Sequence, residues 1–242
     1  MTDATHKRTQ IFCALDNPNL DVVQTLAQTL RGEVDGLKLG LEFFSAQGPN
    51  GIRTIAALGM PIFLDVKLHD IPNTVAGAIR SLVPLAPYYL TLHASGGEEM
   101  LRAARDAAHE AAARLAVIPP RLLAVTVLTS LDESDMAAQG VSGTAGDQVV
   151  RLAELARRAG IDGIVSSPHE IAAARAACGK SFDIVVPGIR PTSGITQDQK
   201  RVMTPSKAVH AGANALVIGR PITGANNPTQ AAAAIRAEVD AA

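Results

Sequence analysis

Short apolar runs alternate with longer amphipathic segments along almost the whole chain. A short apolar run bounded by turn residues indicates a buried strand, and an apolar residue every three or four positions indicates a helix. This pattern predicts strands at residues 10–15, 36–39, 61–68, 88–93, 122–127, 163–166, 183–186 and 215–218. Because strands and helices alternate, the predicted unit is a parallel βαβ repeat.

The helical segments lie between these strands, at residues 19–31, 41–58, from Pro72 onward, in the Ala-rich stretch after Gly97, at 146–158 and at 228–241. Gly48-Pro49-Asn50 is expected to interrupt the second of them, because proline lacks the amide hydrogen that a helix interior needs. The longer segment 131–144 has room for a short helix and a loop.

Length and composition narrow the fold class. The chain has 242 residues, 47% hydrophobic and 19% charged, and a (β/α)8 barrel typically has about 250 residues. Aromatic residues make up only 3%, so Ala, Val, Leu and Ile must fill most of the core. We therefore predict an α/β fold, a single-domain TIM (β/α)8 barrel over residues 1–242.

The charge balance, 22 basic against 23 acidic residues, shows no nucleic-acid or anionic-membrane surface. The polar N-terminal stretch lacks the apolar centre of a signal peptide, and no apolar run is long enough to span a bilayer. Cys13 and Cys178 are far apart in the sequence, which favours two free thiols in a reducing cytoplasm.

The stretch 63–74, FLDVKLHDIPNT, carries the most informative chemistry. Side chains alternate along a strand, so Leu64 and Val66 share one face while Asp65 and Lys67 share the other. Asp70 follows where the strand gives way to a helix, and the carboxyl ends of barrel strands are where catalytic groups lie. A structural ion pair, with Asp70 capping the next helix, is the alternative interpretation.

Neighbouring strands add to this cluster. Lys38 lies in the second strand and Asp16 ends the first, so Asp16, Lys38, Asp65, Lys67 and Asp70 are expected to approach one another at one barrel mouth. An alternating array of this kind keeps every group ionised in a poorly solvated site. A lysine there can act as a general acid, and a fixed aspartate can act on a substrate anion electrostatically.

Gly188-Ile189-Arg190 and Ile218-Gly219-Arg220 follow the seventh and eighth strands, where barrels commonly bind phosphate. Glycine admits backbone amides to an anion and arginine adds a planar fork of donors. Gln199 could fold over the same ligand. The alternative is that both arginines are rim residues and the glycines serve turns.

Other motifs fail. There is no GxGxxG, and Gly179-Lys180-Ser181 has Ala174 where a phosphate-binding loop requires glycine. His69 and His93 have no clear metal partner. The aspartates could bind Mg²⁺, but the interleaved lysines already neutralise them, so no metal is predicted.

Together these residues closely resemble the bacterial orotidine 5′-monophosphate decarboxylases over nearly the whole chain. The most specific match is the DxKxxDIxxT motif, here Asp65, Lys67, Asp70, Ile71 and Thr74. Supporting stretches are Ala14-Leu15-Asp16, Leu37-Lys38, His93-Ala94-Ser95-Gly96-Gly97, residues 125–130, Val186-Pro187-Gly188-Ile189-Arg190 and Ile218-Gly219-Arg220-Pro221.

The resemblance implies a cytoplasmic homodimer that converts orotidine 5′-monophosphate to UMP and CO₂ without a metal or an organic cofactor. Lys67 would protonate C6 within a network of Lys38, Asp65, Lys67 and Asp70, and Asp70 and Thr74 would reach into the partner's site. The implied substrate-binding residues are Asp16 and Lys38 at the ribose, Thr129 or else Ser130 at the pyrimidine, Arg190, Gln199, Gly219 and Arg220 at the phosphate, and also Thr74 and Pro187.

Two rival functions remain open at this point. The 3-keto-L-gulonate 6-phosphate decarboxylases and hexulose-phosphate synthases share the barrel and the DxKxxD pattern but use Mg²⁺; Lys38 and the DIxxT extension argue against them. A non-catalytic phosphate-binding barrel, such as a nucleotide sensor, would have no need of a lysine pair.

Overall fold

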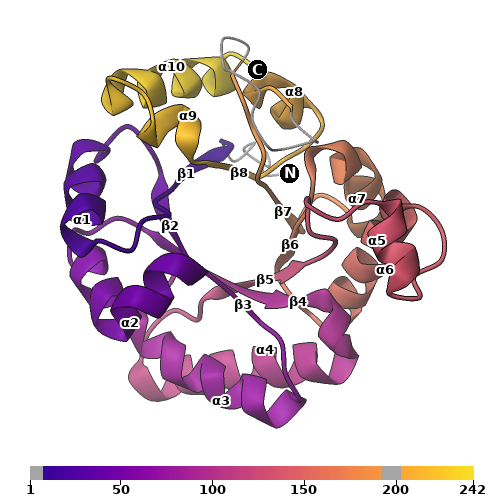
Figure 1. Cartoon of the computed structure of the whole chain (residues 1–242). Coiled ribbons are helices and arrows are strands. Elements are labelled where there is room, and N and C mark those ends of the chain that lie inside the picture. Colours follow the sequence, from indigo (N-terminus) through magenta and orange to yellow (C-terminus); the bar gives the residue numbers. More distant parts are fainter. Residues whose placement is uncertain (1–7, 192–202) are drawn as a thin grey trace, which may run out of the picture.

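The computed structural model describes residues 8–191 and 203–242, and these form a closed barrel of parallel strands ringed by helices (Figure 1). The strands are β1 (Gln10–Ala14), β2 (Gly36–Gly40), β3 (Ile62–Leu68), β4 (Tyr89–His93), β5 (Arg121–Val125), β6 (Gly163–Val165), β7 (Asp183–Val186) and β8 (Ala215–Ile218). Each strand pairs with the next, and β8 pairs with β1. The predicted fold class is confirmed.

The α-helices are α1 (Leu20–Thr29), α2 (Leu41–Ala56), α3 (Pro72–Leu82), α4 (Gly97–Leu115), α5 (Glu133–Ala138), α6 (Ala145–Arg158), α7 (Ile171–Cys178), α8 (Pro205–His210), α9 (Arg220–Thr223) and α10 (Pro228–Asp240). Short 3₁₀ helices cover Val83–Leu85, Ala94–Gly96 and Pro168–Glu170. Gly48, with φ of 58°, breaks α2 where the interruption was predicted, and α5 is the short helix expected in segment 131–144. The sequence pattern missed α7, α8 and α9, which are too short for a clear helical period.

Local sequence explains where several helices begin. The side chain of Asn19 accepts hydrogen bonds from the first turn of α1, and Pro72 occupies the first turn of α3. Asp132 and Thr144 each form a reciprocal capping box, with Asp135 and Asp147 respectively. Such caps satisfy the amide groups that a helix leaves unpaired at its start.

The barrel interior is filled by a compact cluster that is separate from the large core between strands and helices. Phe12, Phe63 and Tyr89 meet there with ring centroids 5.4–5.9 Å apart. Leu123, Val185 and small residues of β1 and β8 complete this cluster. Three of the few aromatic residues thus fill the barrel centre, where large rigid rings occupy space that Ala and Val cannot.

A cluster of polar side chains lies at the amino-terminal end of the barrel, below the aromatic plug formed by Phe12, Phe63 and Tyr89. The phenol of Tyr89 donates a hydrogen bond of 2.7 Å to the Asp183 carboxylate, and Arg121 pairs with the same oxygen at 2.7 Å. Burial, together with the adjacent carboxylate, raises the pKa of Tyr89 far above its usual range, so the phenol remains a proton donor.

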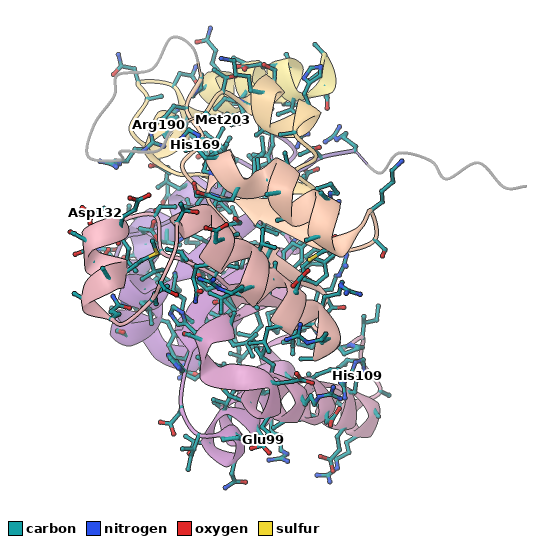
Figure 2. All side chains as sticks on the ribbon, turned by 90° about the vertical axis from the view of Figure 1, so that its right-hand side faces the viewer. Glu99, His109, Asp132, His169, Arg190 and Met203 are labelled. Carbon is teal, nitrogen blue, oxygen red and sulfur yellow. The ribbon has the colours of Figure 1, made fainter. Side chains whose placement is uncertain are left out.

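The loops that follow the strands gather at one end of the molecule. Figure 2 places Asp132, His169 and Arg190, which follow β5, β6 and β7, toward the same end, and His109 of α4 toward the other. In the described ranges, no helix is long and apolar enough to span a bilayer. Cys13 and Cys178 are buried free thiols, as predicted, and burial raises the pKa of Cys13 to about 12.

Replacing Tyr89 with Phe tests the polar group beneath the barrel. The variant leaves Asp183 without its phenol donor, so we expect the free energy of unfolding, measured by urea denaturation, to fall by about 1–2 kcal/mol. Tyr88→Phe is the matched control, because the Tyr88 hydroxyl has only a 3.5 Å contact to Gln10. Equal losses in the two variants would contradict a specific role for the Asp183 bond.

Candidate active site

A cavity of about 330 Å³ opens where the strands end at their carboxyl termini. Of the residues predicted to form the site, it is lined by Asp16, Lys38, Asp65, Lys67, Thr129, Pro187, Arg190, Gly219 and Arg220. These side chains come from segments far apart in the sequence, and parallel strand order brings them together. The barrel mouth predicted from the strand ends therefore exists and contains most of the predicted residues.

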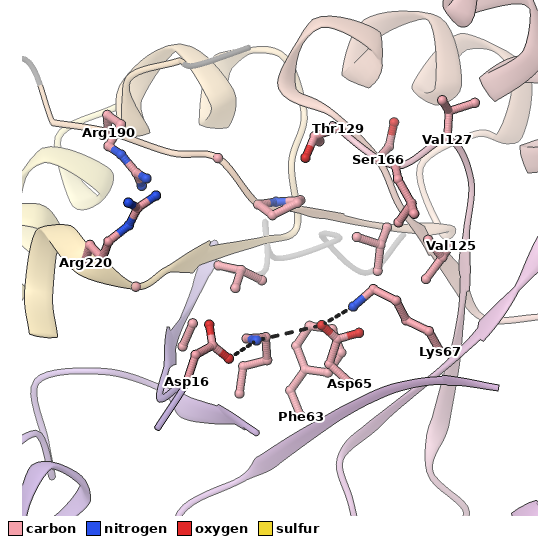
Figure 3. A pocket seen from close by; sticks show the side chains of 18 of the residues that line it. Asp16, Phe63, Asp65, Lys67, Val125, Val127, Thr129, Ser166, Arg190 and Arg220 are labelled. Carbon is pink, nitrogen blue, oxygen red and sulfur yellow. Dashed lines mark hydrogen bonds and ion pairs between the residues drawn. The ribbon is translucent and has the colours of Figure 1, made fainter. Parts of the chain in front are cut away.

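One side of the cavity carries a chain of alternating charges (Figure 3). The Lys38 ammonium lies 2.7 Å from Asp16 Oδ1 and 3.8 Å from Asp65 Oδ2. The Lys67 ammonium lies 2.8 Å from the same Asp65 oxygen. Asp65 is thus held between two cations, which offsets the cost of taking its carboxylate out of water.

The geometry of β3 explains how Asp65 and Lys67 reach the same cavity. Leu64 pairs with Leu90 and Leu68 pairs with Leu92, so three residues of β3, Asp65 to Lys67, face Thr91 alone. This bulge contains Lys67 in the left-handed backbone region, with φ of 50°. Such a conformation costs an L-residue roughly 1–2 kcal/mol. The face assignment made from alternation is correct, and this part of the strand also contains a bulge that alternation does not predict.

Gly40 at the end of β2 gives the Lys38–Asp16 pair its room. A Cβ atom at this position would lie 3.0 Å from Lys38 Nζ and 3.1 Å from Asp16 Oδ1. Any larger residue would push against the ion pair. Gly40 was not among the predicted site residues. A glycine two positions after a lysine has no special meaning in a sequence, and its role becomes clear only when the positions of Lys38 and Asp16 are known.

The opposite side of the cavity is lined by Arg190, which follows β7, and Arg220, the first residue of α9. Figure 3 shows both guanidinium groups directed toward the same end of the cavity. Gly188, with φ of 78°, makes the turn after β7 in a conformation that favours glycine. Two planar cations and backbone glycines at one end form a suitable setting for a phosphate group.

Two of the predicted residues that the structure describes do not line this cavity. Asp70 and Thr74 are exposed, and the Asp70 carboxylate accepts a 2.7 Å hydrogen bond from the amide of Ile71. Among the described residues Asp70 forms no ion pair, so the single chain brings together four of the five charges expected to converge. Gln199 lies outside the described residues.

Two histidines border the lysine end. The His69 and His93 rings lie 5.3 Å apart, and His93 ends β4. Burial lowers the pKa of His93, and the neighbouring His69 and Lys67 lower it further. A neutral His93 ring beside Lys67 adds no competing positive charge at neutral pH.

Thr91 and Ser166 are buried polar residues beside the site that the sequence patterns did not single out. Thr91 contacts both Asp65 and Lys67, and Ser166 lines the cavity with a hydroxyl that has no hydrogen-bond partner in the described chain. Alternation along strand 88–93 could have predicted that Thr91 faces the barrel interior, on the same side as Tyr89 and His93. In the described part of the chain, no three His, Cys, Asp or Glu residues gather as a metal site.

The fold and the cavity define a (β/α)8-barrel protein with paired lysines and aspartates at one end of its site and arginines at the other. The chain matches the model of the orotidine 5′-phosphate decarboxylase / HUMPS family over residues 9–235, and it belongs to that family.

Similar proteins bear this out. The orotidine 5′-phosphate decarboxylase of Rhodospirillum rubrum is 51% identical, over 95% of this chain and 93% of its own. The orotidine 5′-phosphate decarboxylase of Sphingopyxis alaskensis is 54% identical, and the match covers 94% of this chain and 97% of the relative. The crystal structure of the Lactobacillus acidophilus enzyme of the same name superposes with a TM-score of 0.82 at 36% identity, covering 96% of this chain and 99% of that one. The predicted family is confirmed.

Proposed function

We propose that the protein decarboxylates orotidine 5′-monophosphate to UMP and CO₂, the last step of de novo UMP biosynthesis. The observation that carries this proposal is the Asp65 carboxylate held between the Lys38 and Lys67 ammonium groups. This cluster lies in the same cavity as Arg190 and Arg220. A single ligand can therefore contact both a proton donor and two arginines that bind its phosphate.

The chemical step follows from this placement. When the bond between C6 and the carboxylate breaks, its electron pair remains at C6 and CO₂ departs. Lys67 then transfers a proton from its ammonium to C6, and the neutral amine regains a proton from solvent. Asp65 holds the Lys67 ammonium at the reacting carbon, and Lys38 in turn pairs with Asp65. The positive charges of the two lysines stabilise the developing carbanion.

The remaining substrate contacts follow from the family resemblance. Asp16 and Lys38 meet the ribose and Thr129 meets the pyrimidine, and this part of the proposal is supported by the fact that all three residues line the cavity. Pro187, Arg190, Gly219 and Arg220 surround the phosphate, with Gln199 as a further phosphate ligand. Binding energy from the remote phosphate helps the chemical step by holding the substrate in a closed, dry site.

The proposal includes catalysis without a metal or an organic cofactor. Among the described residues, Asp16 and Asp65 are the carboxylates that line the cavity, and each lies within 4 Å of a lysine ammonium. A divalent cation would have to displace those lysines. A cytoplasmic location belongs to the same proposal, since both cysteines remain free thiols.

The test is the loss of orotidine 5′-monophosphate absorbance with purified protein in excess EDTA. We expect decay with the wild-type protein, and a fall of at least about a hundredfold in Lys67→Ala, because the proton donor is gone. Lys207→Ala, which removes an exposed lysine of α8, is the matched control and should retain full turnover.

Each outcome separates the candidate functions. Decay that requires added Mg²⁺ would support the metal-dependent relatives. Binding of UMP without decay would support a nucleotide sensor. Unfolding of Lys67→Ala, seen by circular dichroism, would favour the structural ion-pair interpretation.

Arg220→Ala tests the phosphate end. A charge-assisted hydrogen bond contributes about 1.5–3 kcal/mol, so kcat/KM for the full substrate should fall by about 10- to 100-fold. The matched comparison is orotidine, which lacks the phosphate, and on which the variant and the wild type should be equally efficient. An equal loss on both substrates would show that Arg220 acts elsewhere.

A homodimer completes this proposal. Asp70 and Thr74 lie outside their own cavity on an exposed stretch that also carries Ile71, which is 67% exposed. Exposed apolar residues with polar residues around them are typical of an interface. In a twofold dimer this surface would supply Asp70 and Thr74 to the partner's charged network.

Mixing two inactive variants tests this shared site. A heterodimer of Lys67→Ala and Asp70→Asn subunits has one site with both defects and one with neither. Random exchange should therefore restore about a quarter of wild-type turnover. If Asp70 acted within its own chain, every site would keep one defect and the mixture would stay inactive.

A further inference from the structure

We propose that Thr91 is a positioning residue for the proposed decarboxylation, on which this inference rests. Its hydroxyl holds Asp65 and the backbone of Lys67 in the arrangement that directs the lysine ammonium into the cavity. Thr91 is completely buried and does not line the cavity, so it acts on the reaction through its two neighbours rather than on the substrate.

The contacts are direct. The Thr91 hydroxyl donates a hydrogen bond of 3.0 Å to Asp65 Oδ1 and accepts one of 2.9 Å from the amide of Lys67. The other Asp65 oxygen receives both ammonium groups. With Oδ1 held by Thr91, the carboxylate plane is fixed and Oδ2 faces the lysines.

The bulge explains why a side chain is needed here. Between Leu64 and Leu68 the ladder of β3 and β4 loses its regular pairing. At this irregularity the Lys67 amide donates its hydrogen bond to the Thr91 side chain. This hydrogen bond holds Lys67 in its left-handed conformation at the bulge.

The hydroxyl is suited to join the two groups because it has one proton and two lone pairs. One lone pair accepts from the amide, which leaves the proton for the carboxylate. An apolar side chain of the same shape would leave a buried amide and a carboxylate oxygen each without this partner. Such a substitution is expected to make the position of the Lys67 ammonium less fixed, without leaving a void.

Thr91→Val and Thr91→Ser separate positioning from packing. Valine keeps the shape and the branching at Cβ but loses the hydroxyl, whereas serine keeps the hydroxyl and loses a methyl group. We expect kcat to fall by about 10- to 100-fold in Thr91→Val, since a small misplacement of a catalytic group has that effect. KM should change little, and Thr91→Ser should recover most of the lost kcat.

If Thr91 only filled space, the opposite order would be expected, because serine leaves a void in a buried site and valine does not. Thermal unfolding of both variants accompanies the kinetics. A Thr91→Val enzyme with wild-type kcat, or a Thr91→Ser enzyme that is the more impaired of the two, would overturn the proposal.

A second measurement does not depend on turnover. Acetic anhydride labelling of folded protein, mapped by mass spectrometry, should modify Lys67 faster in Thr91→Val than in the wild type or Thr91→Ser, with Lys207 as the internal reference. If the wild type does not decarboxylate but this difference appears, the proposed function fails while the positioning role stands. Equal Lys67 labelling in all three proteins would overturn the positioning role.

Discussion

The site depends on one carboxylate, that of Asp65, being held between two lysines at the mouth of an apolar barrel. Its exposed side-chain fraction is 13%, so its charge requires partners that are fixed in place. Lys38 reaches it from β2, Lys67 from its own strand and Thr91 from β4. Contacts with the two carboxylate oxygens of Asp65 therefore link β2, β3 and β4. A change in these contacts is expected to alter both the stability of the fold and the geometry of the site.

The bulge in β3 is the local cost of that arrangement. A regular strand would direct Asp65 and Lys67 to the same face but would space their backbones along the strand axis. The bulge places three residues opposite Thr91, and the left-handed Lys67 backbone brings its ammonium to 2.8 Å from Asp65. Strain of this kind persists only where surrounding contacts hold it. The aromatic plug of Phe12, Phe63 and Tyr89 beneath the cavity provides a rigid floor for those contacts.

Much of this could be predicted from the sequence, because alternation of polarity identifies a buried face and parallel strands bring their carboxyl ends together. Asp16, Lys38, Asp65 and Lys67 converge as strand order requires. Short-range patterns carry no register, however, so the bulge and the Thr91 contacts could not be foreseen. Asp70 was expected in the same cluster, yet the turn after β3 carries it to the surface. Helices α7 to α9 are set by tertiary packing more than by periodicity.

The two ends of the cavity differ in charge, and this difference can orient a substrate. The lysine end carries Asp16, Lys38, Asp65 and Lys67, so its cations and anions balance. The arginine end carries Arg190 and Arg220, and within residues 8–191 and 203–242 the acidic residues that line the cavity, Asp16 and Asp65, belong to the lysine end. A phosphate dianion is thus attracted to the arginines, whereas beside Asp65 it would meet a fixed negative charge. Both ends line one cavity of about 330 Å³, so one small nucleotide can engage both. The chain as a whole has a net charge of only −1, so this orientation comes from the placement of a few side chains and not from the protein's overall field.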